Sequence, residues 1–145
     1  MRAAALAVAA LLAGCARFQV GFGRRVSDEE FVLRSEIGAY YQEVGAAFAS
    51  GSADALTGLF DPGISKPMTR VQIRAWAADF FEKHGPARFE VEKLDFERAG
   101  HESAVVELTY RVTTRDGDGS FGGTERDRLV KRGRRWSVAS WEKSP

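Results

Sequence analysis

The chain has 145 residues, with 21 Lys and Arg against 20 Asp and Glu, and 44% of its residues are apolar. This charge balance argues against a nucleic-acid binder, which neutralises many phosphates with basic side chains. The apolar fraction, which includes ten Phe and three Trp, is too high for a disordered chain and suits one compact domain. Only one Cys is present, so no disulfide forms within the chain.

The N-terminus has the pattern of an export signal. Arg2 precedes an uncharged run of apolar residues from Ala3 to Ala13, and Gly14 and Cys15 follow it. At about 1.5 Å per residue a helix of this length is too short to cross a bilayer of roughly 30 Å. The run instead suits the apolar region of a signal peptide.

The segment Leu-Ala-Gly-Cys at 12–15 resembles the lipobox of bacterial lipoproteins. The resemblance implies that residues 1–14 are a signal peptide that is removed, and that Cys15 carries the lipid and anchors the protein outside the cytoplasm. Ala16, where some lipoproteins have aspartate, implies the periplasmic side of the outer membrane in a Gram-negative host, or otherwise the outer face of the cell membrane. The alternative is an ordinary secretory signal in which Cys15 is incidental.

The mature chain is predicted to contain a tether and one domain. The acylated cysteine and tether occupy residues 15–27, and the domain occupies residues 28–142. Phe18, Val20 and Phe22 alternate along the tether, which leaves open that this segment adds a strand to a sheet edge or lies on the membrane.

Apolar spacing predicts three helices, over about 28–50, 53–60 and 70–84. Ser27 and Thr69 are each followed three residues later by Glu or Gln, the pattern of a capping box at a helix N-terminus. After the third helix the apolar period changes to two, which predicts strands over about 89–96, 104–112, 124–131 and 136–140. The apolar phase reverses near Glu92 and Lys93, which predicts a β-bulge that bends the first strand. Short connections favour antiparallel neighbours, so the predicted fold is α+β, with three N-terminal helices packed on a curved four-stranded antiparallel sheet.

This order resembles the nuclear transport factor 2-like superfamily, the cystatin-like cone of ketosteroid isomerase and the SnoaL-like polyketide cyclases. The resemblance covers about residues 28–142 and rests on the long first helix, on Gly-Ser-Ala-Asp-Ala-Leu at 51–56 and on Gly-Arg-Arg-Trp-Ser-Val at 133–138. It implies a pocket between the helices and the concave face of the sheet. It does not imply an enzyme, since the same cone serves as isomerase, dehydratase, binding module and dimerisation scaffold.

Few residues have the pattern of a catalytic group. The inward row of the second strand, from Ala104 to Val112, contains no carboxylate, and Asp79 on the third helix is more typical of a surface acid. His84 and His101 lack the spacing of metal ligands. We therefore predict no catalytic residue, no metal site and no cofactor.

The best candidates for lining a ligand pocket are Tyr40, Tyr41, Trp76 and Tyr110, because aromatic side chains combine a large apolar surface with a polar tip. The alternative for each of them is ordinary core packing.

A basic segment surrounds the last turn. The phase of its strand leaves open whether Arg126 and Arg128 face into the cone, where they suit an anionic ligand, or outward. Outward arginines suit solvent, anionic lipid headgroups or acidic polymers of the cell surface.

The sequence favours a membrane-anchored, extracytoplasmic module without catalytic activity, which binds a small apolar ligand or another protein, including a second copy of itself. The first alternative is an enzyme of the isomerase, dehydratase or cyclase type acting on a small apolar substrate. A carboxyl group with a raised pKa inside the cone would favour this alternative. The second alternative is an accessory subunit of an envelope assembly.

The lipid anchor has a direct test. We expect Cys15→Ser to abolish labelling of the protein by a fatty-acid analogue in growing cells, because the thiol that accepts the lipid is gone. Replacement of the neighbouring residue, Ala16→Ser, serves as the control and should label normally. Normal labelling of Cys15→Ser would contradict the anchor.

Overall fold

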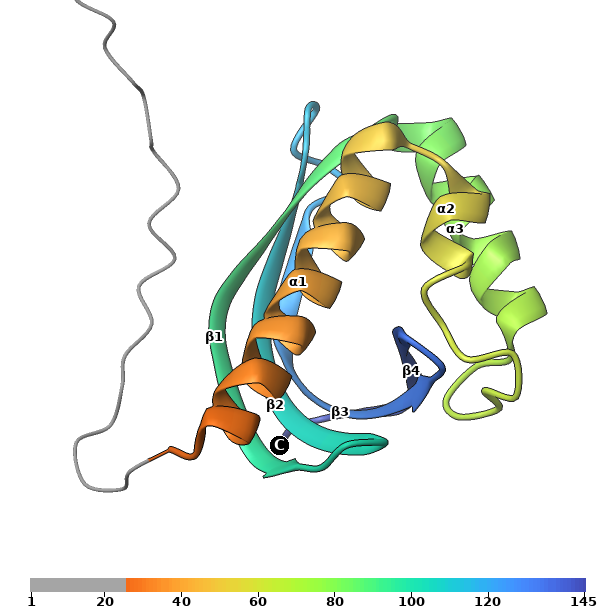
Figure 1. Cartoon of the computed structure of the whole chain (residues 1–145). Coiled ribbons are helices and arrows are strands. Elements are labelled where there is room, and N and C mark those ends of the chain that lie inside the picture. Colours follow the sequence, from red (N-terminus) through yellow and green to blue (C-terminus); the bar gives the residue numbers. More distant parts are fainter. Residues whose placement is uncertain (1–25) are drawn as a thin grey trace, which may run out of the picture.

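The computed structural model describes residues 26–145, so the predicted signal peptide, Cys15 and most of the tether lie outside the described residues. Three helices come first, and four strands follow them (Figure 1). The elements are α1 (Asp28–Ser50), α2 (Ala53–Thr57), α3 (Arg70–His84), β1 (Ala87–Ala99), β2 (Ser103–Thr114), β3 (Phe121–Arg132) and β4 (Arg135–Lys143). The strands form one antiparallel sheet in the order β1-β2-β3-β4. The predicted fold class is confirmed.

The capping residues begin α1 and α3 as the sequence predicts, with one difference. At α3, Thr69 and Gln72 each accept a hydrogen bond from the other's backbone N–H, which is the complete capping box. At α1, the Ser27 side chain accepts from the Glu30 N–H at 3.2 Å. The Glu30 carboxylate, however, turns along the helix to Arg34 at 2.6 Å, an i,i+4 ion pair.

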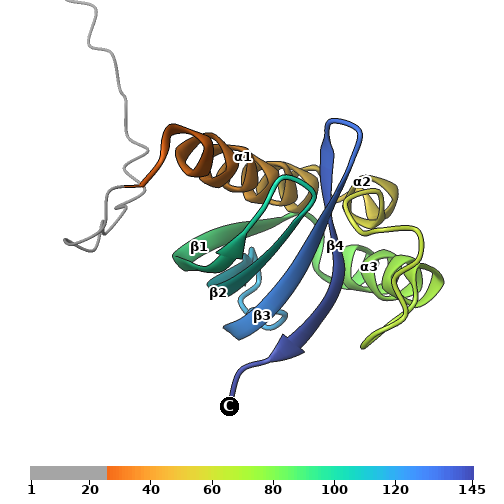
Figure 2. The same ribbon diagram turned by 60° about the horizontal axis from the view of Figure 1, so that its bottom comes forward.

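The sheet is strongly curved and wraps around α1, which lies along its concave face (Figures 1 and 2). The register of β1 against β2 shifts between Val91 and Lys93, which confirms the predicted bulge at Glu92. Further shifts occur after Phe96 in β1 and after Arg128 in β3. An extra residue in one strand increases the local twist and bends it, so these positions account for the curvature.

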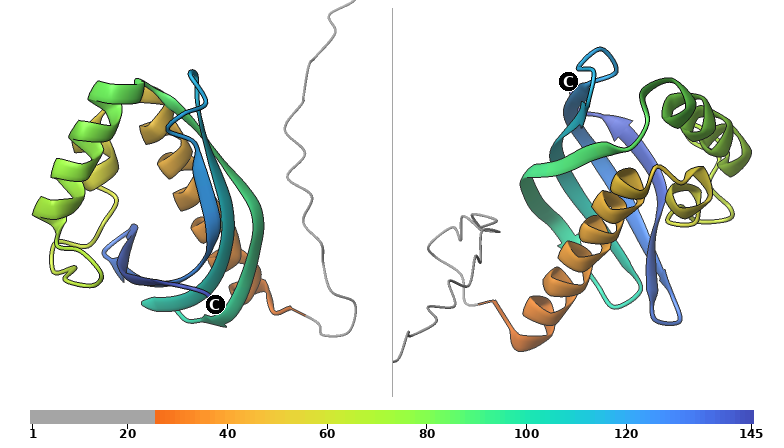
Figure 3. Two further views of the ribbon diagram at one scale, coloured as in Figure 1. Left: turned by 180° about the vertical axis from the view of Figure 1, so that it is seen from behind. Right: turned by 90° about the horizontal axis from the view of Figure 1, so that it is seen from above.

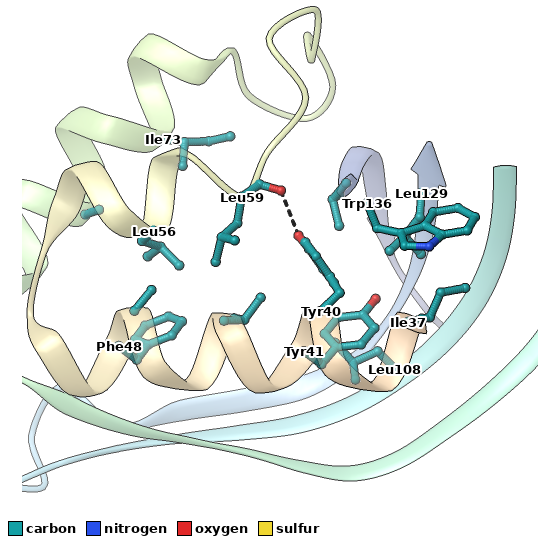
Figure 4. Packing of buried hydrophobic residues seen from close by; sticks show 14 of the residues in the cluster. Ile37, Tyr40, Tyr41, Phe48, Leu56, Leu59, Ile73, Leu108, Leu129 and Trp136 are labelled. Atoms are coloured by element: carbon teal, nitrogen blue, oxygen red, sulfur yellow. Dashed lines mark hydrogen bonds between the residues drawn. The ribbon is translucent and has the colours of Figure 1, made fainter. Parts of the chain in front are cut away.

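The core fills the space between α1 and the concave face. Ile37 of α1, Val106 of β2 and Leu129 of β3 are fully buried there. Figure 4 shows the side chains of α1 pointing toward those of α2 and of the sheet. Beyond the C-terminal end of α1, α2 and α3 form a second helical layer (Figure 3).

The segment between α2 and α3 is fixed to the free edge of the sheet. The Asp61 N–H donates to the Val138 carbonyl at 2.9 Å, and Phe60 forms a parallel bridge with the same residue of β4. The Asp61 carboxylate also binds Arg132 at 2.7 Å. These contacts cover part of an edge strand that would otherwise present unpaired backbone groups. Within residues 26–145, no helix has the length and apolar character needed to span a membrane.

The core assignment predicts a contrast between two identical substitutions. Val106 is fully buried, whereas Val71 of α3 is 79% exposed. We expect Val106→Ala to lower the free energy of unfolding by about 1–3 kcal/mol, because it removes buried methyl groups and leaves a void. Val71→Ala should stay within about 0.5 kcal/mol of wild type. Urea denaturation measures both, and equal effects would contradict the packing.

Candidate functional site

Two carboxyl groups lie on the concave face of β3. The register places Asp127 opposite Val106 and Glu125 opposite Leu108. Val106 and Leu108 are buried against the helices, and directly opposed residues of neighbouring strands share one face of the sheet. Glu125 and Asp127 therefore face the helices, two residues apart on the same strand.

Asp127 is held in the core by a tyrosine of α1. The Tyr41 hydroxyl donates a hydrogen bond to Asp127 Oδ2 at 2.6 Å, and the two residues are only 4% and 2% exposed. Burial raises the pKa of the Asp127 carboxyl, and the hydrogen bond from Tyr41 opposes that rise. Burial and the nearby carboxylate also raise the pKa of Tyr41 well above its ordinary value, so this hydroxyl keeps its proton.

Glu125 has the higher pKa of the two carboxyls, because the pKa of Asp127 is raised only to about 6. Its side chain is half-buried, and burial together with the neighbouring Asp127 raises its pKa to about 8. Asp127 Oδ1 is buried and has no N–H or hydroxyl partner among the described residues. Asp127 raises the pKa of Glu125, and Glu125 lowers that of Asp127, so we infer that the pair holds one shared proton near neutral pH. The Tyr110 hydroxyl extends the chain at Glu125, and burial together with this carboxyl raises the pKa of Tyr110.

Aromatic rings surround the exposed end of this chain. Tyr110 meets Phe121 edge-on at 6.2 Å between ring centroids, and Phe121 meets Phe80 of α3 in the same way at 5.8 Å. Trp76 stacks on Phe80 at 5.3 Å and is 39% exposed. The half-buried carboxyl of Glu125 therefore lies near rings that a small apolar molecule can contact.

The four predicted pocket residues have different positions. Tyr41 and Tyr110 both belong to the hydrogen-bonded chain, one at each end. Tyr40 lies beside Tyr41 but points its hydroxyl to the Leu59 carbonyl at 2.9 Å (Figure 4), which ties α1 to the end of α2. Trp76 lies in the aromatic group of α3, apart from the carboxyls. A ligand-binding role for any of the four stays a prediction.

Glu125 and Asp127 are missing from the residues that the sequence singles out. The signal is the alternation of β3, in which Leu129, Asp127 and Glu125 occupy one face. The neighbouring Val130 makes the opposite phase equally apolar, and this hides the two acids. The same alternation decides the other open question, because Arg126 and Arg128 lie on the outer face, away from the helices.

The two histidines lie outside this site. The His84 ring contacts Asp116 Oδ2 at 3.0 Å and holds the β2–β3 loop against the end of α3. A side chain at Gly119 would collide with the same ring, so this loop position requires glycine. His101 lies near Glu29 at 3.9 Å and is exposed. Within residues 26–145, no group of three or more His, Cys, Asp or Glu is arranged to hold a metal ion.

Comparison with known proteins identifies the fold. No family model and no curated protein matches the sequence. A Mycobacterium tuberculosis protein of unknown function has 18% identity and a TM-score of 0.68 over 81% of this chain and 73% of its own. A Novosphingobium aromaticivorans protein named as a scytalone dehydratase has 11% identity and a TM-score of 0.68 over 81% and 88%. A Streptomyces avermitilis protein, named as a dehydratase of the nuclear transport factor 2-like family, has 14% identity and a TM-score of 0.62 over 81% and 97%. At this level of identity the comparison establishes the nuclear transport factor 2-like cone and nothing of the chemistry.

The shared proton predicts an unusual dependence of stability on pH. The folded protein keeps the Glu125 proton up to about pH 8, whereas the ordinary carboxyl value is 4.5. Between these values unfolding releases this proton, so stability should fall as pH rises. Glu125→Gln removes the part of this fall that Glu125 causes, whereas Asp127, whose pKa is raised to about 6, contributes in both proteins. We expect wild type to lose about 1–2 kcal/mol more than the variant across the window, allowing for solvent screening of a half-buried group.

Glu107→Gln provides the control, because Glu107 lies on the outer face of the neighbouring strand. This variant should keep the wild-type slope in urea denaturation at a series of pH values. Parallel slopes for wild type and Glu125→Gln would show that Glu125 carries no extra proton in the folded state.

Proposed function

We propose that this domain is an acid–base enzyme of the isomerase or dehydratase type, acting on a small and mostly apolar substrate held against the concave face. The observation that carries the proposal is the half-buried Glu125, whose pKa is raised to about 8. A group that titrates close to the working pH can both give and accept a proton, which is the requirement for general acid–base catalysis.

Each member of the hydrogen-bonded chain has a distinct role in this proposal. Glu125 moves the proton, because it is the carboxyl that solvent and substrate reach. In a dehydration the carboxyl pair takes a proton from the carbon next to the carbonyl and gives a proton to the leaving hydroxyl, so that water departs and the pair returns to its starting state. In an isomerisation the pair carries a proton from one carbon to another. Asp127, fixed by Tyr41, stabilises the proton on its neighbour, and Tyr110 orients the Glu125 carboxyl.

A second candidate is the binding module without catalysis. The exposed Trp76, stacked on Phe80 and beside Phe121, favours it, because exposed rings on a rigid helix are typical of surfaces that hold apolar ligands. In that case the carboxyl pair only adds hydrogen bonds to a polar group of the ligand. An accessory role in an envelope assembly and a homodimer through the sheet remain further proposals.

We also propose that the domain is displayed on the extracytoplasmic side of a membrane by a lipid on Cys15. The sequence of residues 12–15 supports this proposal. The domain begins at Asp28 with α1, so residues 15–27 are available as the tether. Fully extended, they reach roughly 45 Å, which is enough to keep the domain clear of the lipid headgroups.

One assay separates the enzyme from the binding module. Panels of β,γ-unsaturated ketones and β-hydroxy ketones both give conjugated products that absorb in the ultraviolet. We expect turnover by wild type, a fall in kcat/KM of about 10²–10⁴-fold for Glu125→Gln, and a change within about twofold for Glu107→Gln. A gain in melting temperature shared by wild type and Glu125→Gln, without turnover, would instead establish the binding module. Neither turnover nor a thermal shift across the panels would contradict both candidates.

A further inference from the structure

The outer face of the sheet carries a hollow of about 660 Å³ next to the α2–α3 connection. Its lining holds basic and hydroxyl side chains, one carboxylate, which belongs to Glu142, and several apolar residues. The basic and hydroxyl side chains are those of Lys66, Arg98, Arg126, Arg128, Ser103 and Ser140. The hollow is separate from the concave site, because Arg126 and Arg128 occupy the face of β3 opposite to Glu125 and Asp127.

The register places two of these arginines on either side of the same valine. Arg98 of β1 lies opposite Val105 of β2, and Val105 lies opposite Arg128 of β3. Neighbouring strands are about 4.8 Å apart, so the two arginine backbones are separated by roughly 10 Å across a single small valine. Arginine side chains are long enough to meet over that valine. Ser140 extends the same row onto β4, where it lies opposite Arg128.

Other cations on this face have carboxylate partners. Arg88 pairs with Glu90 at 2.8 Å, and Arg111 pairs with Glu92 at the same distance. Arg126 is held by two carboxylates, which belong to Glu97 at 2.7 Å and Glu142 at 3.3 Å.

Lys66, Arg98 and Arg128 are different. Among residues 26–145, no carboxylate lies within ion-pair distance of any of the three. Like charges grouped on one face of a sheet repel each other, and Arg98 and Arg128 lie on the two strands that flank β2. The positive charge that has no carboxylate partner therefore lies at the hollow. The other arginines named above for this face, Arg88, Arg111 and Arg126, are each paired with a carboxylate.

We propose that this hollow binds a phosphate group. Guanidinium groups form paired, charge-assisted hydrogen bonds with phosphate oxygens, and the lysine ammonium adds a point charge. Ser103 and Ser140 supply hydroxyl donors at the rim. Three uncompensated cations match a group with two negative charges, and such a ligand removes the repulsion between Arg98 and Arg128. The phosphate belongs either to a free ligand or to a lipid headgroup, and the chemistry of the site is the same for both.

The first experiment titrates the full chain in neutral detergent with pyrophosphate and follows binding by calorimetry. We expect saturable binding by wild type and an affinity at least about tenfold weaker for the double variant Arg98→Gln/Arg128→Gln, which loses two charge-assisted donors. The double variant Arg88→Gln/Arg111→Gln removes the same charge from paired arginines of the same face and should bind within about twofold of wild type. Equal losses in the two variants would show a general charge effect and overturn the site.

The second experiment identifies the source of the phosphate. The full chain carrying Cys15→Ser is incubated with vesicles of neutral phosphatidylcholine, with and without phosphatidylglycerol, and its partition is measured by sedimentation. Residues 1–14 are present in every variant, so their contribution to vesicle binding cancels when variants are compared on one vesicle composition. A headgroup ligand predicts tighter binding to the anionic vesicles that Arg98→Gln/Arg128→Gln abolishes, whereas a free ligand predicts pyrophosphate binding without this difference. No response to either probe would overturn the proposal.

Discussion

The hydrogen bond between Tyr41 and Asp127 is the contact on which the arrangement of this domain depends. It joins the middle of α1 to the middle of β3 at 2.6 Å, inside a core that is otherwise apolar. A carboxyl group in such a place is costly unless its oxygens are hydrogen-bonded. Tyr41 satisfies one oxygen of Asp127, and the shared proton that we infer for the carboxyl pair would satisfy the other. The raised pKa of Glu125 is therefore a consequence of how the core accommodates Asp127.

The alternation of side chains along β3 places acidic and basic residues on opposite faces of the sheet. Its residues at 125 and 127 place acids on the concave face, and its residues at 126 and 128 place arginines on the outer face. The two inner acids lie close together in a buried position, where water screens the repulsion between charges least. Of the two outer arginines of β3, Arg128 is exposed and has no carboxylate partner among the described residues, whereas Arg126 is bound by Glu97 and Glu142. A shift of one residue in register would exchange the two sets, so the apolar partners Val106 and Leu108 fix both sites at once.

The sequence predicts well those features that depend on local spacing. The capping box at Thr69 and the bulge at Glu92 both follow from a few neighbouring residues, and both are present. Local spacing leaves the facing of β3 open, because Leu129 and Val130 are both apolar and support opposite phases. It is decided by pairing with β2 and by a register shift after Arg128, and neither is a local property of β3. The shared proton is even harder to predict from the sequence, because it requires Tyr41, which lies 86 positions away from Asp127 in the chain.

At Trp76, the periodicity of the sequence predicts more burial than the structure shows. It belongs to the apolar stripe of the third helix, yet it is 39% exposed, whereas Ile73 and Ala77 on either side are buried. Periodicity identifies the buried side of a helix, but the width of the buried stripe depends on what covers it. α3 lies beyond the end of α1 and packs mainly on α2 (Figure 3). The edge of its apolar stripe is therefore only partly covered, and Trp76 contacts the rings of Phe80 and Phe121 there.

The backbone shared with proteins at 11–18% identity sets the concave surface but not what that surface carries. In this chain two features meet there, a proton held near neutral pH and an aromatic margin that leaves one large ring exposed. An apolar residue at 125 would avoid the repulsion between two carboxyls, but it would leave the buried Oδ1 of Asp127 without a neighbour that can carry a proton. The half-buried position of Glu125 is the feature that the proposed proton transfer explains, because a carboxyl that served Asp127 alone could be buried with it.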